Sequence, residues 1–283
     1  MSIQSVGIIG AGTMGNGITQ ACAVSGLQVV MVDINDAAVQ KGLATISGSL
    51  DRLIKKEKMT EAEKSAALSR IKTSTNYADF NSTQMVIEAA TENYELKLKI
   101  LKQLDSIVSK ETIIASNTSS ISITQMAAEV SNPDRFIGMH FFNPVPMMAL
   151  VEIIRGLQTS DATHALVQNM AKDLGKEPIT VKNAPGFVVN RILVPMINEA
   201  FFVLAEGLAT PEDIDAGMKL GCNHPIGPLA LADMIGLDTC LAIMEVYFNN
   251  FNDSKYRPCP LLREMVAAGY LGRKSGKGVY NYN

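Results

Sequence analysis

Three glycines near the start of the chain have the spacing GxGxxG. They follow a short apolar run and precede a helical pattern over residues 13–25. In a strand–turn–helix unit the first glycine allows a tight turn, the second leaves room for a pyrophosphate, and the third lets helix and strand pack closely. The amide groups at the start of the helix attract phosphate. The pattern predicts a dinucleotide-binding loop made of Gly10, Gly12, Thr13, Met14 and Gly15.

An acidic residue, Asp33, follows the next predicted strand, 29–32. A carboxylate in this position accepts hydrogen bonds from the hydroxyls of an adenine ribose and repels a 2′-phosphate. We therefore expect the cofactor to be NAD(H) rather than NADP(H).

Of the three histidines, His140 has the setting best suited to chemistry. It lies in a predicted buried strand, 136–141, at the edge where open α/β sheets bind ligands. A single histidine of this kind is more often a packed core residue. However, Glu152 lies in the apolar run 150–154, where an unpaired carboxylate is costly. If the two segments pair, the carboxylate can orient the imidazole and stabilise its protonated form, as a metal-free alcohol dehydrogenase requires. His164, on a solvated helix, has no evident partner.

Several further polar groups have two interpretations. The segment 116–120 either caps a turn or directs Asn117 and Ser119 toward a nicotinamide. Asn190, in an apolar helical pattern, either bonds a neighbouring helix or reaches a cleft. The basic segment 52–58 is by default a solvated helix face, although Ser49 and Lys56 could share a face and contact an anionic ligand.

The overall composition is ordinary for a soluble protein, with 47% hydrophobic and 19% charged residues in 283. A net charge of −3 argues against a general nucleic-acid binder. Four cysteines without a CxxC pair favour free thiols in a reducing cytosol over disulfides or a metal site. The fold begins close to Met1, and charged or polar residues interrupt every apolar stretch, so we expect a cytoplasmic protein without a targeting peptide or membrane span.

Strand and helix patterns alternate through residues 1–184, which predicts a Rossmann-like, doubly wound, mostly parallel sheet with a helical hairpin inserted at about 35–70. Residues 185–283 predict an all-α domain. Its expected helices span 187–208, 211–220, 228–248 and 261–268. The first of them is apolar nearly all round and must be covered on both sides, so we expect it to contribute to a homodimer interface.

The chain resembles the L-3-hydroxyacyl-CoA dehydrogenase family, in particular its short bacterial members that act on 3-hydroxybutyryl-CoA. The resemblance covers essentially the whole chain. Its motifs, in order, are GAGTMG at 10–15, SNTSS at 116–120, GMHFFNPVP at 138–146, LVE at 150–152, PGFVVNR at 185–191, DMIGLD at 233–238 and GRKSGKGVY at 272–280.

The resemblance implies reversible, NAD-dependent oxidation of (3S)-3-hydroxybutyryl-CoA to acetoacetyl-CoA, within fatty-acid or butanoate metabolism. His140 is then the general acid/base, Glu152 its orienting partner, and Ser119 and Asn190 hydrogen-bond around the reacting carbonyl. Further matches to cofactor-contacting positions of the family are Glu92, Lys97, Asn143, Lys274 and again Ser119. The positions that contact CoA match Ser49 and Lys56, with Arg52 beside them.

Two other functions remain open at this stage. One is a β-hydroxyacid dehydrogenase of the 6-phosphogluconate type, but such enzymes usually rely on a lysine of the second domain as acid/base, which the His140 and Glu152 pair argues against. The other is a non-catalytic NAD(H)-binding structural or sensor protein, which would not need the full set of Ser119, His140, Glu152 and Asn190.

Overall fold

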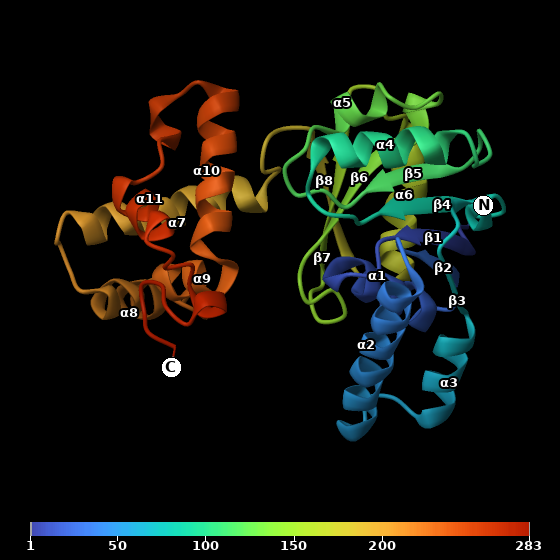
Figure 1. The fold of residues 1–283 in the computed structure, drawn as a ribbon, viewed down its shortest axis with the longest axis horizontal. Helices are drawn as coiled ribbons and strands as arrows, with labels where there is room; N and C mark the ends of the chain where they lie inside the picture. The colour runs from blue at the N-terminus through green and yellow to red at the C-terminus, as the bar shows by residue number, and fades with distance from the viewer. Residues whose placement is uncertain (1, 283) are drawn as a thin grey trace. The chain divides into compact units, whose positions relative to one another are not determined.

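The computed structural model describes residues 2–282 and divides the chain into two compact units. The first unit ends at Ala184 and contains the strands. The second begins at Pro185 and is helical (Figure 1).

The first unit is built on one eight-stranded sheet with the order β3-β2-β1-β4-β5-β6-β7-β8. Neighbouring strands are parallel except for β6 and β7, which are antiparallel. This confirms the predicted, mostly parallel doubly wound sheet. The strands are β1 Ser5–Ile9, β2 Gln28–Val32, β3 Ile71–Ser74, β4 Met85–Glu88, β5 Ile113–Ser116, β6 Phe136–Phe141, β7 Leu150–Arg155 and β8 Glu177–Lys182.

Most helices of the first unit begin where the sequence supplies a side-chain cap, and the exception is the helix that follows Gly12. Asn35 caps α2 by accepting a bond from the Ala38 amide, and Thr60 forms the predicted capping box with Glu63 at the start of α3. Because α2 and α3 lie between β2 and β3, they form the predicted helical hairpin. The helices are α1 Thr13–Val24, α2 Asp36–Lys55, α3 Glu61–Ser69, α4 Tyr94–Asp105, α5 Ile123–Ala127 and α6 Asp161–Asp173.

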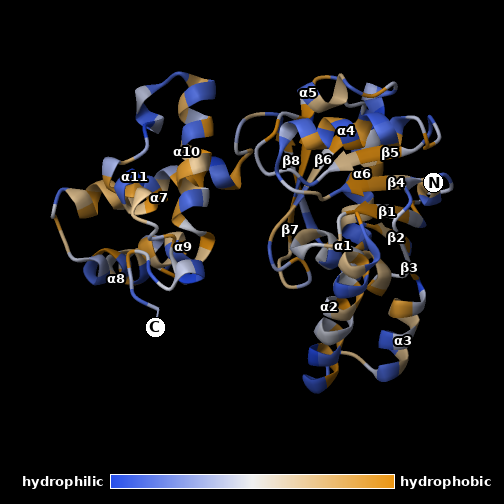
Figure 2. Cartoon of the chain, viewed as in Figure 1, coloured by the Kyte–Doolittle hydropathy of each residue, from blue (hydrophilic) through white to orange (hydrophobic). Residues whose placement is uncertain are grey.

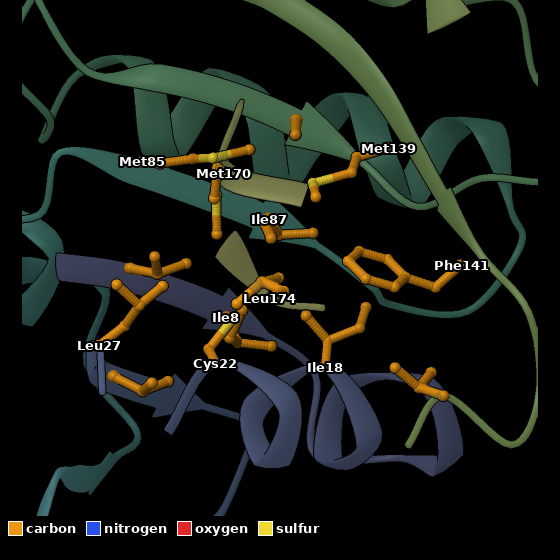
Figure 3. Packing of buried hydrophobic residues seen from close by; sticks show 14 of the residues in the cluster. Ile8, Ile18, Cys22, Leu27, Met85, Ile87, Met139, Phe141, Met170 and Leu174 are labelled. Carbon is orange, nitrogen blue, oxygen red and sulfur yellow. The ribbon is translucent and has the colours of Figure 1, made fainter. Parts of the chain in front are cut away.

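The core of this unit lies between the sheet and the helices that cover it. Strands β4, β5 and β6 are buried along their whole length, as expected for a sheet covered on both faces. Figure 2 shows the apolar colour concentrated on β4. In Figure 3, side chains from the strands meet helix α1, and Met139 and Phe141 of β6 lie on the same side as Ile18. Successive strand residues alternate between faces, so His140 belongs to the opposite face.

The second unit is a helical bundle around α7, which packs against the four other long helices of the unit. These helices bury much of its surface, although Ile192 is 67% exposed. The helices are α7 Val189–Ala205, α8 Pro211–Gly221, α9 Pro228–Ile235, α10 Leu237–Phe251 and α11 Pro260–Ala267.

One predicted helix of the second unit is wrong. The sequence pattern predicted a continuous helix over 228–248, whereas the structure has α9 and α10 with a break at Gly236. Gly236 has φ of +106°, a conformation outside the helical region that glycine adopts without a Cβ clash. The Lys274 ammonium lies 2.9 Å from the position that a Cβ would take there.

The expectation that His164 has no partner is also wrong. Its Nε2 lies 2.9 Å from the Thr180 hydroxyl oxygen, so the ring ties α6 to β8. Partial burial, followed by the nearby Arg155 charge, lowers the pKa of His164. The ring therefore has a structural role in this unit.

None of the helices within residues 2–282 combines the length and apolar character needed to cross a membrane. In the same part of the chain, no group of three or more His, Cys, Asp or Glu side chains is arranged to hold a metal ion.

We predict that native thiol reactivity is confined to one cysteine. Cys222 is exposed, whereas Cys22, Cys240 and Cys259 are buried, and burial raises the pKa of Cys22 and of Cys240 to about 12. Because the thiolate is the reactive species, Ellman's reagent at pH 8 should release one equivalent of product rapidly from the folded protein and four after denaturation. A Cys222→Ser control should abolish the rapid phase, and rapid release of two or more equivalents from folded protein would contradict the burial.

Candidate active site

The glycine loop lies at the point where the strand order reverses. The chain runs outward from β1 to β2 and β3, then returns to place β4 on the other side of β1. Open α/β sheets bind ligands at the carboxyl ends of the strands that flank such a point. The loop after β1 and the end of β4 therefore mark the candidate site.

The geometry of the loop fits a dinucleotide. Gly10 has φ of +99°, and a Cβ on Gly15 would come within 1.8 Å of the Gly10 carbonyl oxygen, so both positions require glycine. A Cβ on Gly12 would meet no atom within 4 Å, which leaves this side of the loop open to a ligand. The amides at the start of α1 provide hydrogen-bond donors for phosphate, with Thr13 and Met14 as the first two residues of this helix.

Asp33 joins the end of β2 to the glycine loop. Its Oδ2 accepts a hydrogen bond from the Ala11 amide at 2.6 Å, and its Oδ1 accepts one from the Ile34 amide at 2.6 Å. Each carboxylate oxygen can accept more than one hydrogen bond. Asp33 can therefore fix the loop and still accept ribose hydroxyls.

His140 and Glu152 lie opposite one another in the antiparallel pair β6–β7. The His140 Nδ1 is 2.8 Å from the Glu152 Oε2, and the two side chains are almost completely buried. With Nδ1 bonded to the carboxylate, proton exchange with a ligand would use Nε2. The sheet thus supplies an oriented imidazole with a buried countercharge, the arrangement that general acid–base chemistry requires.

The segment after β5 is organised around the Glu92 carboxylate. Glu92 Oε1 accepts bonds from the amides of Ser119 at 2.9 Å and Ser120 at 3.2 Å, and from the hydroxyl of Thr118. Burial alone would raise the pKa of Glu92, but the Lys97 charge and these hydrogen bonds lower it overall. The Ser119 hydroxyl is held least closely, at 3.4 Å, and can turn toward a ligand.

Asn117 performs a structural task at the same edge. Its Oδ1 accepts a bond from the Phe141 amide at 2.9 Å, which links the ends of β5 and β6. Asn143 is the second residue of the connection from β6 to β7 and is exposed. Both residues therefore lie at the strand edge that carries His140.

Lys97 is buried, with 1% of its side chain exposed, and its ammonium group bonds protein atoms. The Nζ lies 2.7 Å from Glu88 Oε1, 3.1 Å from the Ala90 carbonyl oxygen and 3.4 Å from Glu92 Oε2. Lys97 is thus linked to the segment after β5 through the Glu92 carboxylate. Glu88 was not among the predicted site residues, although a charge within the apolar run 84–89 is the same signal that identified Glu152.

Three predicted site residues of the first unit, Ser49, Arg52 and Lys56, belong to α2 and not to this strand edge. Ser49 and Arg52 lie in the last part of α2, and Lys56 caps its end. Ser49 lies fourteen positions after the N-cap Asn35, about 20 Å along the helix axis. Arg52 and Lys56 are exposed, so they can meet an anionic group in solution.

Two predicted residues belong to the second unit. Asn190 lies in the first turn of α7 and is partly buried. Lys274 lies in a short 3₁₀ turn, where its Nζ bonds Asp238 Oδ2 at 2.7 Å. Burial would raise the pKa of Asp238, but bonds from Lys274 and a backbone amide lower it. An anionic ligand would therefore compete with Asp238 for Lys274.

Comparison with known proteins identifies the family of nearly the whole chain. Residues 5–184 match the NAD-binding domain, and residues 186–282 the C-terminal domain, of 3-hydroxyacyl-CoA dehydrogenase. A 3-hydroxybutyryl-CoA dehydrogenase of Bradyrhizobium diazoefficiens is 51% identical, over 99% of this chain and 96% of that protein. A probable 3-hydroxybutyryl-CoA dehydrogenase of Deinococcus radiodurans is 54% identical, over 98% and 99%.

A solved structure agrees with these relatives. The crystal structure of (S)-3-hydroxybutyryl-CoA dehydrogenase from Ralstonia eutropha is 75% identical, with a TM-score of 0.99 and full coverage of both chains. Since both domains of one enzyme family match in sequence and the glycine loop has the form that a dinucleotide needs, this chain belongs to the 3-hydroxyacyl-CoA dehydrogenase family, and NAD is its cofactor.

Proposed function

We propose that the chain interconverts (3S)-3-hydroxybutyryl-CoA and acetoacetyl-CoA through His140 as general acid/base. The observation that carries this proposal is the 2.8 Å contact between His140 and Glu152 at the carboxyl end of β6, on the strand edge that also bears the glycine loop. Two relatives that are 51% and 49% identical to this chain are named 3-hydroxybutyryl-CoA dehydrogenase, after the four-carbon substrate.

Bound NAD⁺ supplies the hydride acceptor. In the oxidation direction His140 takes the proton from the substrate hydroxyl, and Glu152 stabilises the imidazolium that forms. In the reverse direction the imidazolium returns this proton to the 3-oxygen. Ser119, whose hydroxyl is only weakly held by Glu92, and Asn190 donate hydrogen bonds to the substrate oxygens and stabilise developing charge.

The CoA part of the substrate needs cations. We assign this role to α2, where Arg52 and Lys56 are exposed near Ser49. Guanidinium and ammonium groups attract phosphate, and their local charge acts despite the net charge of −3.

The family assignment also bears on the alternatives. It disfavours a β-hydroxyacid dehydrogenase of the 6-phosphogluconate type, because both family domains are those of 3-hydroxyacyl-CoA dehydrogenase. We further assign the enzyme to fatty-acid or butanoate metabolism in the cytoplasm.

Replacing His140 should remove catalysis without removing cofactor binding. General acid–base help is worth roughly 100- to 10,000-fold, so His140→Ala should reduce kcat for acetoacetyl-CoA reduction by about this factor. Glu152→Gln should also reduce kcat, because the imidazolium loses its countercharge. The assay follows NADH absorbance, and NADH binding is measured by fluorescence.

His164→Ala is the matched control, because His164 bonds Thr180 and takes no part in the proposed mechanism. It should keep near-normal turnover. Full turnover by His140→Ala would show that another group acts as the acid/base.

Asp33 should control the choice of cofactor. Asp33→Ala should weaken NADH affinity roughly tenfold or more, because hydrogen bonds to a charged group are lost. Asp33→Asn keeps the size and an acceptor but removes the negative charge, and it should improve the use of NADPH relative to NADH. Competition between the two cofactors in acetoacetyl-CoA reduction measures the ratio, and an unchanged ratio in both variants would contradict the ribose assignment.

We also propose a homodimer formed through the second unit. Helix α7 is apolar nearly all round, and Ile192 remains 67% exposed despite the surrounding helices. Sedimentation velocity at micromolar concentration should give the mass of two chains. A single-chain mass across the concentration series would reject the dimer.

A further inference from the structure

Glu88 is a carboxylate buried completely at the end of β4, in a position that the proposed mechanism does not use. Its Oε1 accepts bonds from the Lys97 ammonium and the Ala90 amide, each at 2.7 Å. Its Oε2 accepts a bond from the Ser116 hydroxyl at 2.6 Å. Ala90 and Ser116 lie at the carboxyl ends of β4 and β5, next to the candidate site, and the Lys97 side chain reaches this edge from α4.

Such a buried ion pair is weak evidence for stability by itself. Removing two charges from water costs free energy that their attraction often only offsets, and well-packed apolar residues of the same volume can stabilise a fold as well. Val86 and Ile114, two positions before Glu88 and Ser116 on the same face of the sheet, are buried apolar residues, so this part of the sheet accepts apolar side chains. We therefore ask which neighbouring groups the Glu88–Lys97 pair holds in position.

The contacts continue from Glu88 to the loop that follows β5, residues 116–120. Lys97 bridges Glu88 and Glu92, with Nζ–O distances of 2.7 and 3.4 Å. The far side of the Glu92 carboxylate then receives the amides of Ser119 and Ser120. Glu88 itself contacts only the start of this loop, where its carboxylate accepts the Ser116 hydroxyl and its carbonyl oxygen accepts the Asn117 amide. The Glu88 charge reaches the Ser119 amide through Lys97 and Glu92.

We propose that Glu88 is a positioning residue of the active site, which fixes Lys97 and Glu92 so that the Ser119 hydroxyl is directed at the reacting carbonyl. This inference rests on the proposed function. Without the Glu88 charge, the Lys97 ammonium has one carboxylate left, Glu92. The ammonium then draws Glu92 toward itself and away from the amides of the loop, because an unpaired buried charge is costly.

The test is a double-mutant cycle on kcat/KM for acetoacetyl-CoA with the full-length protein. Glu88→Gln, which keeps the size of the side chain, should lower kcat/KM roughly tenfold or more. Ser119→Ala as a single substitution should also lower kcat/KM. In the double variant the Glu88→Gln loss should largely disappear, since a residue that acts through Ser119 has no effect once the hydroxyl is absent.

A purely structural role gives a different result. General loosening of the sheet would lower kcat/KM by the same factor with or without the Ser119 hydroxyl, and such additivity would overturn the inference. Glu95→Gln, on the exposed first turn of α4, is the matched control and should leave kcat/KM unchanged.

A second variant covers the case in which Glu88→Gln does not fold. Ser116→Ala removes the hydrogen bond to Glu88 Oε2 and also the bond that the Ser116 hydroxyl oxygen accepts from the Thr118 amide. It should lower kcat/KM a few-fold or more, roughly the value of these bonds, with the same dependence on Ser119. Additive losses here would also reject the inference. If the unaltered protein fails to reduce acetoacetyl-CoA with NADH, the proposed function falls and this inference with it, whereas turnover with additive losses rejects the inference alone.

Discussion

A buried carboxylate must have a partner, and this constraint connects the strands to the chemistry of the site. Glu152 is completely buried in β7, and the antiparallel register of β6 and β7 places His140 directly opposite. An apolar partner would leave a charge without compensation in a region of low dielectric constant. The strand pairing that gives Glu152 its partner therefore also holds an oriented imidazole at the strand edge where ligands bind.

The same constraint operates a second time across β4 and β5. Glu88 is satisfied by Lys97, Ser116 and the Ala90 amide, and Lys97 in turn contacts Glu92. The two networks differ in what they present to a ligand. In the first, a ring nitrogen able to exchange a proton is oriented by one acid. In the second, charged groups engage one another, and the part that remains adjustable is the Ser119 hydroxyl at 3.4 Å.

Much of the fold followed from local signals in the sequence. The glycine spacing, the Thr60 and Glu63 capping box, and the change from alternating strands to continuous helices each reflect interactions within a few residues, so they could be read directly. The errors involve other interactions. Gly236 breaks a helical pattern through a positive φ, and His164 finds Thr180 on a strand distant in sequence. Glu88 carries the same signal as Glu152, a charge within an apolar strand, but its partners Lys97 and Ser116 come from other elements.

The amino-acid sequence alone identifies which chemical groups are present and which segments bury them, because side-chain type and periodicity are local properties. It predicted a dinucleotide loop, an acid after β2, and an acid within an apolar strand that needed a partner. The partners of these groups depend on the three-dimensional fold, since strand register joins residues far apart in the chain. The fold paired His140 with Glu152, placed Lys97 between Glu88 and Glu92, and bonded Asn117 to the backbone of β6.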